Sequence, residues 1–200
     1  AYTKNVVHRA ESNFVVQAGG FSIDESFPLG TVIANLAVNN EPVYSNLRGT
    51  IAMAKLSGQP DSATSQWFFN LKDNLRLDYD ASNQGYTVFG EVTGDGMAII
   101  DQIAALPKFN LGGALGSIPL QNFDAASEEM PTESNLIVIN KVTIIDEATD
   151  TAASLSPVLN TSIPAPTDPQ QPEESSGGGG SFGFIFLALM ALGLRKKIIG

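Results

Sequence analysis

Cysteine is absent from the 200 residues of the chain, and histidine and tryptophan occur once each. The lack of cysteine excludes a disulfide scaffold, a thiolate zinc site, a thiol nucleophile and a redox switch. Basic residues are also scarce, since 11 Lys and Arg stand against 21 Asp and Glu and leave a net charge of −10. A surface of this charge repels phosphate, so we expect no nucleic acid partner.

The composition divides the chain into three parts. Residues 1–148 look globular, and the 43% of hydrophobic residues in the chain suffices for one domain with a core. Residues 149–180 form a Pro-, Ser- and Gly-rich linker, which we expect to be an extended spacer because proline lacks the N–H donor of helix and sheet. Residues 181–200 are expected to form a hydrophobic C-terminal helix with a basic end. The chain begins at Ala1 without a start or export signal, so we expect an upstream part of the gene product to be missing.

Period-two alternation of apolar side chains dominates the globular part and predicts strands. The expected strands cover residues 13–17, 49–54, 66–71, 86–92 and 135–145. Residues 96–106 are the exception, because Met97, Ile100 and Ile103 follow helical spacing and Pro107 ends the run. Many short strands and one late helix indicate a mainly β fold, either an antiparallel barrel or a sandwich.

Residue spacing alone reveals no metal, nucleotide or nucleophile chemistry. The lone His8 is interpreted as a packed structural residue, and Ser65 lacks the context of a catalytic serine. Asp78–Asp80 lacks the Gly and Glu of a calcium loop and is interpreted as a solvated turn. Asn160–Ser162 fits a glycosylation sequon, to which we assign no role, and by spacing alone Arg9 is a surface arginine. We therefore expect neither a metal nor a cofactor.

Several segments, in the right order along the chain, resemble the cyclophilin family of peptidyl-prolyl isomerases, with loops similar to those of its bacterial branch. The resemblance extends from about Tyr2 to about Ile145 and implies a closed antiparallel eight-stranded barrel with a proline-binding groove on its outer face. In the family, two strands and a helix precede the His-Arg motif, so we expect these elements to be missing here. The matching segments are His8-Arg9 and residues 13–20, 44–54, 61–71, 77–78 and 85–92.

The same resemblance implies a site, with Arg9 as the catalytic residue. The substrate-binding residues that it implies are Phe14, Val15, Gln17, Ala54, Lys55, Phe68, Leu77 and Tyr86. Ala54 and Lys55 are expected to contact the substrate through the main chain, so Lys55 in place of a common Asn should be tolerated. Arg76 occupies the position of a Trp in cyclosporin-sensitive members, so we expect weak or no cyclosporin binding.

The C-terminal part carries thirteen uncharged residues, Phe182 to Leu194, followed by Arg195-Lys196-Lys197. This pattern predicts a helix that crosses or anchors to the membrane with its basic end in the cytoplasm and the isomerase domain on the far side. The preceding Gly177, Gly178, Gly179 and Gly180 resemble a Gly-Gly sorting signal of Gram-negative bacteria. The resemblance implies cleavage by a rhomboid-type processing protease, and the rival interpretation is a permanent single-span anchor.

Two functional hypotheses remain open. The first is an exported bacterial peptidyl-prolyl cis-trans isomerase, periplasmic or at the cell surface, that acts on proline-containing segments of client proteins without a cofactor. The second is a surface-tethered proline-peptide binding module, or a chaperone, without significant turnover.

Overall fold

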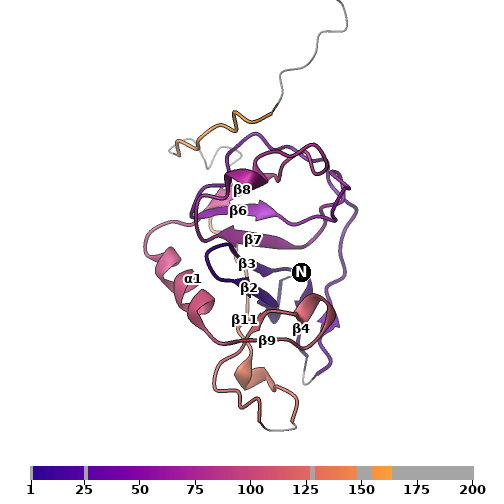
Figure 1. Ribbon diagram of the computed structural model, residues 1–200. Coiled ribbons are helices and arrows are strands. Elements are labelled where there is room, and N and C mark those ends of the chain that lie inside the picture. Colours follow the sequence, from indigo (N-terminus) through magenta and orange to yellow (C-terminus); the bar gives the residue numbers. More distant parts are fainter. Residues whose placement is uncertain (1, 25–26, 127–128, 148–154, 164–200) are drawn as a thin grey trace, which may run out of the picture. The chain divides into compact units, whose positions relative to one another are not determined.

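The computed structural model describes residues 2–24, 27–126, 129–147 and 155–163. These residues belong to one compact unit, Ala1–Ala165, whereas the second unit, Pro166–Gly200, lies outside the described residues. Within the described part, the fold is mainly β, with short strands, one α-helix and three 3-10 helices (Figure 1). The predicted fold class, mainly β with one late helix, is therefore confirmed.

A five-stranded antiparallel sheet forms the centre of the fold, in the order β2-β3-β7-β6-β8. Its pairing aligns Arg9 with Gln17, Gln17 with Phe68, and Phe68 with Ala52. Side chains that face each other across antiparallel strands lie on the same side of the sheet. These four residues, here called the Arg9 row, therefore present their side chains on one face. The strands are β2 (Arg9–Glu11), β3 (Val15–Ala18), β6 (Thr50–Met53), β7 (Trp67–Asn70) and β8 (Val88–Glu91).

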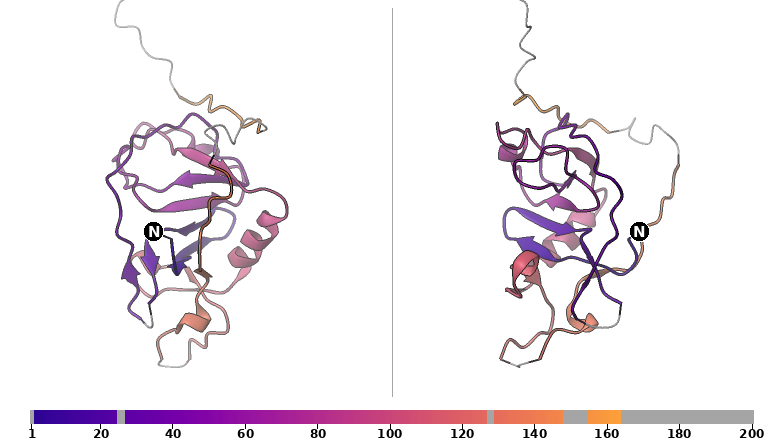
Figure 2. Two further views of the ribbon diagram at one scale, coloured as in Figure 1. Left: turned by 180° about the vertical axis from the view of Figure 1, so that it is seen from behind. Right: turned by 90° about the vertical axis from the view of Figure 1, so that its right-hand side faces the viewer.

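The two faces of this sheet bury different clusters. On the face of the Arg9 row, the buried residues are Val15, Ala52, Phe68 and Val88. The opposite face packs against the one α-helix of the described residues, α1 (Gly96–Ala105), which lies beside the sheet in Figures 1 and 2. The core on the helix side contains Val7, Ala10, Val16, Ala18, Leu71 and Ile100. This division follows from the period-two alternation that the sequence showed.

Two smaller sheets complete the described part, in the orders β11-β1-β4-β5 and β10-β9. They surround a third buried cluster of Val6, Ile23, Ile118, Leu120 and Leu136. Their strands are β1 (Asn5–Val6), β4 (Phe21–Ser22), β5 (Gly30–Thr31), β9 (Lys108–Phe109), β10 (Ile118–Pro119) and β11 (Val138–Ile139). The 3-10 helices are η1 (Leu75–Leu77), η2 (Gly113–Leu115) and η3 (Glu133–Asn135).

The expected closed eight-stranded barrel is not formed by the described residues, whose strands make three separate sheets. The central sheet ends at β8, which pairs only with β6 in this part of the chain. A barrel closes only when every edge strand finds a partner. The six described strands outside the central sheet are each only two residues long, and they pair with one another and not with β8.

Four of the five predicted strands are confirmed, and each of their ends differs from the prediction by one or two residues. The predicted helix is also confirmed, and it ends before Pro107 because the residue preceding a proline avoids helical geometry; Leu106 has ψ 153°. The predicted strand over residues 135–145 is reduced to β11, Val138–Ile139, because its partner β1 offers only two residues. Ile144 and Ile145 beyond it are 73% and 97% exposed.

The described part of the predicted linker, residues 155–163, forms no helix or strand of its own and lies against the domain. Ser45 donates its N–H to the carbonyl oxygen of Val158 at 2.8 Å, and Asn160 donates its N–H to that of Val43 at 2.9 Å. Among the described residues no helix is long and apolar enough to cross a membrane. The predicted C-terminal helix, 181–200, and the glycine run 177–180 lie outside the described residues.

Candidate functional site

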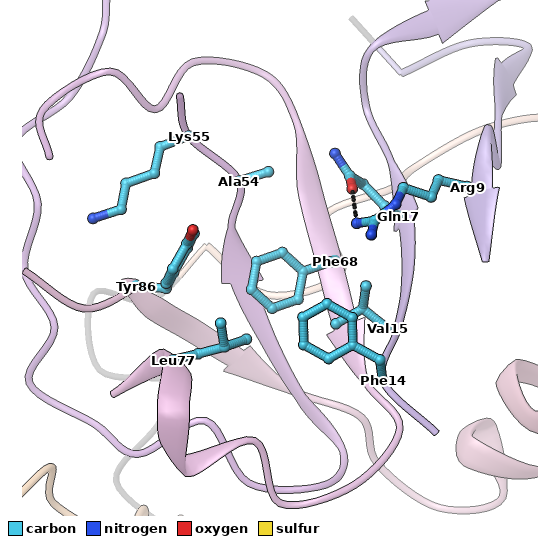
Figure 3. Close-up of a pocket in the computed structure, with 9 residues that line it drawn as sticks. All are labelled: Arg9, Phe14, Val15, Gln17, Ala54, Lys55, Phe68, Leu77 and Tyr86. Atoms are coloured by element: carbon cyan, nitrogen blue, oxygen red, sulfur yellow. Dashed lines mark hydrogen bonds between the residues drawn. The ribbon is translucent and has the colours of Figure 1, made fainter. Parts of the chain in front are cut away.

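A cavity of about 160 Å³ opens on the face of the central sheet that carries the Arg9 row. Four of its lining residues belong to strands of the sheet, and Phe14, Ala54 and Lys55 lie beside the ends of β3 and β6. The opposite wall comes from η1 and the loop before β8. Figure 3 shows all the lining residues: Arg9, Phe14, Val15, Gln17, Ala54, Lys55, Phe68, Leu77 and Tyr86. The structure thus brings together the nine residues named from the sequence, while their roles in binding and catalysis remain predictions.

The floor of the cavity is apolar. Phe68 and Val15 are 5% and 2% exposed, and the rings of Phe68 and Tyr86 meet edge to face with centroids 5.9 Å apart. Phe14 and Leu77 are half-buried and pack against the same cluster. A hollow of this size and lining accepts a small apolar ring.

Arg9 lies at the rim of this cavity and is held from two sides. One terminal nitrogen donates to Gln17 Oε1 at 3.2 Å, and its Nε lies 3.5 Å from Glu11 Oε1. Gln17 is in turn oriented by donating its Nε2 to Gln66 Oε1 at 2.9 Å. The second terminal nitrogen of Arg9 has no partner among the described residues, so it is available to a bound molecule.

Sequence reasoning did not assign Glu11 and Gln66 to the site. Glu11 stands two residues after Arg9 on β2, where the alternation of a strand places both side chains on one face. That spacing was a usable signal for an ion pair. Gln66 precedes β7 by one residue, and only the pairing of β3 with β7 brings it to Gln17.

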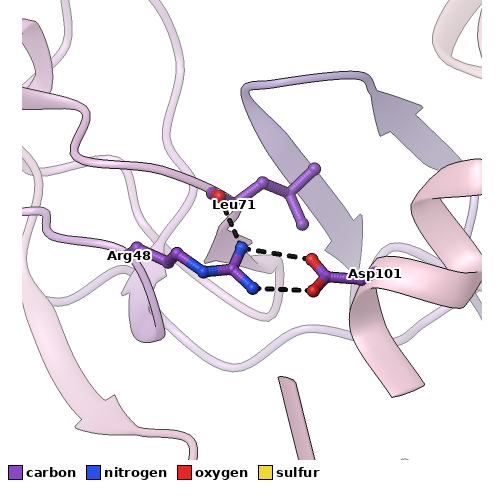
Figure 4. A network of polar contacts seen from close by, with 3 residues as sticks. All are labelled: Arg48, Leu71 and Asp101. Atoms are coloured by element: carbon purple, nitrogen blue, oxygen red, sulfur yellow. Dashed lines mark hydrogen bonds and ion pairs between the residues drawn. The ribbon is translucent and has the colours of Figure 1, made fainter. Parts of the chain in front are cut away.

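Arg48 is a second arginine of the fold, and both of its terminal nitrogens have hydrogen-bond partners. Its guanidinium donates to the carbonyl oxygen of Leu71 at 2.6 Å and to both carboxylate oxygens of Asp101, at 3.1 and 2.7 Å (Figure 4). Because these contacts connect α1 with the end of β7, Arg48 has a structural role. Arg9 differs because it keeps donors free beside an apolar cavity.

Lys55 contributes to the cavity in a way that the sequence did not predict. Its Nζ turns back to donate to the carbonyl oxygens of Asn83 and Gly85, and it lies 4.8 Å from the centroid of the Tyr86 ring. Burial lowers the pKa of Lys55 and raises the pKa of Tyr86. The main-chain N–H and C=O of Lys55 make no hydrogen bond within the described residues. Their expected contact with a peptide remains a prediction.

Beneath the cavity lies a network of buried polar side chains that the sequence analysis missed. Asp78 is 2% exposed, so the interpretation of this residue as part of a solvated turn was wrong. Its carboxylate accepts the Ser45 hydroxyl and, at 2.6 Å, the N–H of Asn46. Asp80 does behave as a turn residue, since its carboxylate accepts the N–H of Asn83 at 2.9 Å. Within the described ranges no cluster of His, Asp and Glu could hold a metal ion.

Asparagine side chains extend this network to the main chain of the cavity residues. Asn46 Nδ2 lies 3.3 Å from the carbonyl oxygens of both Leu77 and Tyr86. Asn74 Nδ2 donates to the carbonyl oxygen of Phe14 at 2.9 Å. Buried amide nitrogens that donate in this way fix the backbone that they bind. The network therefore positions the two opposite walls of the cavity.

His8 lies outside the cavity, although it precedes Arg9. It is 1% exposed, and its ring meets Phe21 edge to face at 5.0 Å, which confirms the interpretation of a packed structural residue. Burial lowers the pKa of His8 to about 4.

Comparison with known proteins places this geometry in context. Residues 1–124 match the family model described as cyclophilin type peptidyl-prolyl cis-trans isomerase/CLD. The chain is 41% identical over 112 residues to a peptidyl-prolyl cis-trans isomerase of Acinetobacter baylyi, which covers 56% of this chain and 57% of that protein. It is 42% identical over 113 residues to peptidyl-prolyl cis-trans isomerase A of Dickeya dadantii, which covers 56% of each. The chain thus spans a little over half the length of these relatives.

Among solved structures, a cyclophilin type peptidyl-prolyl cis-trans isomerase of Cryptosporidium parvum, crystallised in the presence of the dipeptide Ala-Pro, matches with a TM-score of 0.38 and 21% identity. The match covers 54% of this chain and 65% of that one. Membership rests on the family model, which matches more than half of the 200 residues. The chain belongs to the cyclophilin-type peptidyl-prolyl cis-trans isomerase family.

Proposed function

We propose that the protein is a peptidyl-prolyl cis-trans isomerase that acts on proline-containing peptide segments without a cofactor. The observation that carries this proposal is the position of Arg9, whose guanidinium lies at the rim of an apolar cavity with a terminal nitrogen unpartnered among the described residues. The family to which the chain belongs supports the same activity. In this proposal, the proline ring of the client segment binds in the cavity.

The chemistry needs neither a nucleophile nor a metal. Rotation about the X-Pro bond is slow because amide resonance imposes a barrier of about 18–20 kcal/mol. In the twisted transition state the prolyl nitrogen loses this resonance and regains a lone pair. A guanidinium donor at that nitrogen stabilises the transition state more than the ground state, which is the requirement for catalysis.

The other cavity residues hold the peptide during rotation. The apolar floor of Phe68 and Val15 and the facing wall at Leu77 receive the proline ring, which fixes one side of the rotating bond. The free main-chain groups of Lys55 bind the backbone of the peptide on the other side. Gln17 keeps the guanidinium of Arg9 aimed at the cavity. Arginine suits this role because its fork of donors stays charged and rigid.

A second candidate function is a proline-peptide binding module without significant turnover. The specific observation that favours it is the ion pair of Arg9 with Glu11, which occupies Nε and offsets part of the guanidinium charge. Both candidates bind proline peptides in the same cavity, and only turnover separates them. Exchange NMR on a proline peptide, with the native chain and Arg9→Ala side by side, distinguishes the two.

The proposal also includes export and cell-surface delivery, which rest on the sequence of residues 164–200 alone. Cleavage near Gly177–Gly180 would release a domain that is soluble without the hydrophobic helix, since residues 1–148 carry most of the net negative charge. We expect the mature protein in its host to end within or close to the glycine run. Mass spectrometry of the C-terminal peptide tests this, and recovery of intact residues 182–194 from the mature pool would favour the permanent anchor.

A further inference from the structure

The segment of residues 155–163 packs onto the domain through a small set of polar contacts. It runs beside residues 43–45 and makes two main-chain hydrogen bonds with them, through Val158 and Asn160. Of the whole segment only Asn160 is half-buried, whereas every other residue of the segment is exposed. One side chain therefore turns inward from a segment that otherwise faces solvent.

The inward side chain of Asn160 satisfies all of its hydrogen-bonding groups. Its Nδ2 donates to the carbonyl oxygen of Asp78 at 2.6 Å and to that of Pro42 at 2.9 Å. Its Oδ1 accepts the N–H of Ser162 at 2.9 Å, which fixes the amide with its nitrogen toward the domain. An amide held at both ends binds in one orientation only.

The carbonyl oxygen of Asp78 occupies a sensitive place behind the cavity. Asp78 directly follows Leu77, whose carbonyl oxygen accepts the N–H of Tyr86 at 2.9 Å, and Leu77 and Tyr86 both line the cavity. Gly85 packs so closely against the same Asp78 oxygen that there is no room for a Cβ at this position. Asn160 therefore binds at the junction of the two backbone segments that carry the Leu77 and Tyr86 wall.

We propose that Asn160 is a positioning residue and that residues 155–163 act as a clasp on the back of the proline cavity. By holding the Asp78 carbonyl, the clasp keeps Leu77 and Tyr86 at the distance that accepts a proline ring. Arg9 and Gln17 lie on β2 and β3, away from this junction, so the clasp acts on peptide affinity and leaves rotation of the bound bond unchanged. This inference rests on the proposed function and adds a determinant that lies C-terminal to the matched residues 1–124.

The test uses the full chain with Asn160→Leu, which keeps the approximate size of the side chain and removes its donors. Thr161→Val is the matched control, because Thr161 is exposed in the same segment. We expect Asn160→Leu to raise KM for a proline peptide by about three- to tenfold with kcat nearly unchanged. In hydrogen exchange, the Tyr86 amide should exchange faster, while the Ala10 amide, bound to Ser117 at 2.9 Å on another side of the fold, keeps its rate.

A second variant, Ser162→Pro, keeps Asn160 and removes the N–H that orients its amide, so we expect a smaller effect in the same direction. Unchanged KM and unchanged Tyr86 exchange in Asn160→Leu would overturn the proposal. Faster exchange of Ala10 together with Tyr86 in both variants would also overturn it, because Asn160 would then support the whole fold. If the native chain shows no turnover, the proposed function fails, whereas peptide affinity by calorimetry and Tyr86 exchange still decide the clasp.

Discussion

Arg9 and Gln17 face each other across β2 and β3, and the guanidinium donates to the side-chain oxygen of Gln17 at 3.2 Å. Gln17 cannot rotate freely, because its Nε2 donates to Gln66. The guanidinium is therefore aimed before any peptide arrives. Preorganised donors of this kind contribute more to a transition state than donors that must reorient.

Gln17→Leu should lower kcat for a proline peptide by about tenfold, because a hydrogen bond to a charged group contributes about 1.5 kcal/mol or more. Peptide affinity should fall much less, since the apolar floor of the cavity is unchanged. Steady-state kinetics combined with calorimetric binding measures both quantities. Glu11→Gln is the contrasting variant: it removes the negative charge beside Arg9 Nε and should leave kcat equal or higher. A loss of activity in Glu11→Gln as large as that in Gln17→Leu would count against the assigned roles.

The buried His8 predicts a specific pH dependence of stability. Because the pKa of His8 is lowered to about 4 in the folded state, the unfolded chain takes up a proton near pH 6.5 while the folded chain does not. The free energy of unfolding should therefore fall by about 3 kcal/mol as the pH drops from 6.5 toward 4. Urea unfolding at several pH values measures this contribution.

His8→Gln serves as the control for this dependence, because glutamine does not titrate. The difference in stability between the native chain and His8→Gln should change with pH between 6.5 and 4 and stay constant above that range. A difference that is flat over the whole range would show that His8 is protonated without cost in the folded chain.

Weak cyclosporin inhibition is expected from the side chain beside Phe14. The Cζ of Arg76 lies 4.4 Å from the centroid of the Phe14 ring, and its side chain is exposed. The resemblance to the family implies that cyclosporin-sensitive members have a Trp at this position. Arginine supplies a poorer apolar wall than tryptophan and no indole N–H. Arg76→Trp should tighten inhibition at least tenfold in the isomerase assay, by about 1.4 kcal/mol or more. Nanomolar inhibition of the unaltered protein would contradict this account.

Four of the five strands of the central sheet and the residues of the cavity were predictable from sequence because most of them belong to long contiguous motifs, whereas the three-residue β2 was not predicted. Alternation located β3, β6, β7 and β8, and resemblance to the family supplied residues that the structure gathers around one cavity. Alternation cannot report whether a strand finds a partner, which explains why residues 135–145 form only the two-residue β11.

The buried polar network was beyond sequence reasoning for a different reason. Asp78 and Asn160 are polar residues in segments of loop composition, and such residues are usually solvated. Their burial depends on contacts across 82 positions of sequence, such as the bond from Asn160 to the Asp78 carbonyl. The composition of residues 149–180 contained no signal that residues 155–163 would bind to the domain, or where.

The most direct test of the account is the turnover of a proline peptide by the full chain and by Arg9→Ala, measured by exchange NMR with binding measured in the same samples. Arg9→Ala should reduce kcat by about 100-fold, comparable to the loss of one transition-state donor, while the affinity for the peptide changes little. Arg9→Lys keeps the positive charge but loses the rigid set of guanidinium donors, so its kcat should lie between those of the native chain and Arg9→Ala. Equal turnover by the native chain and Arg9→Ala would contradict the proposed role of Arg9 and favour the binding module.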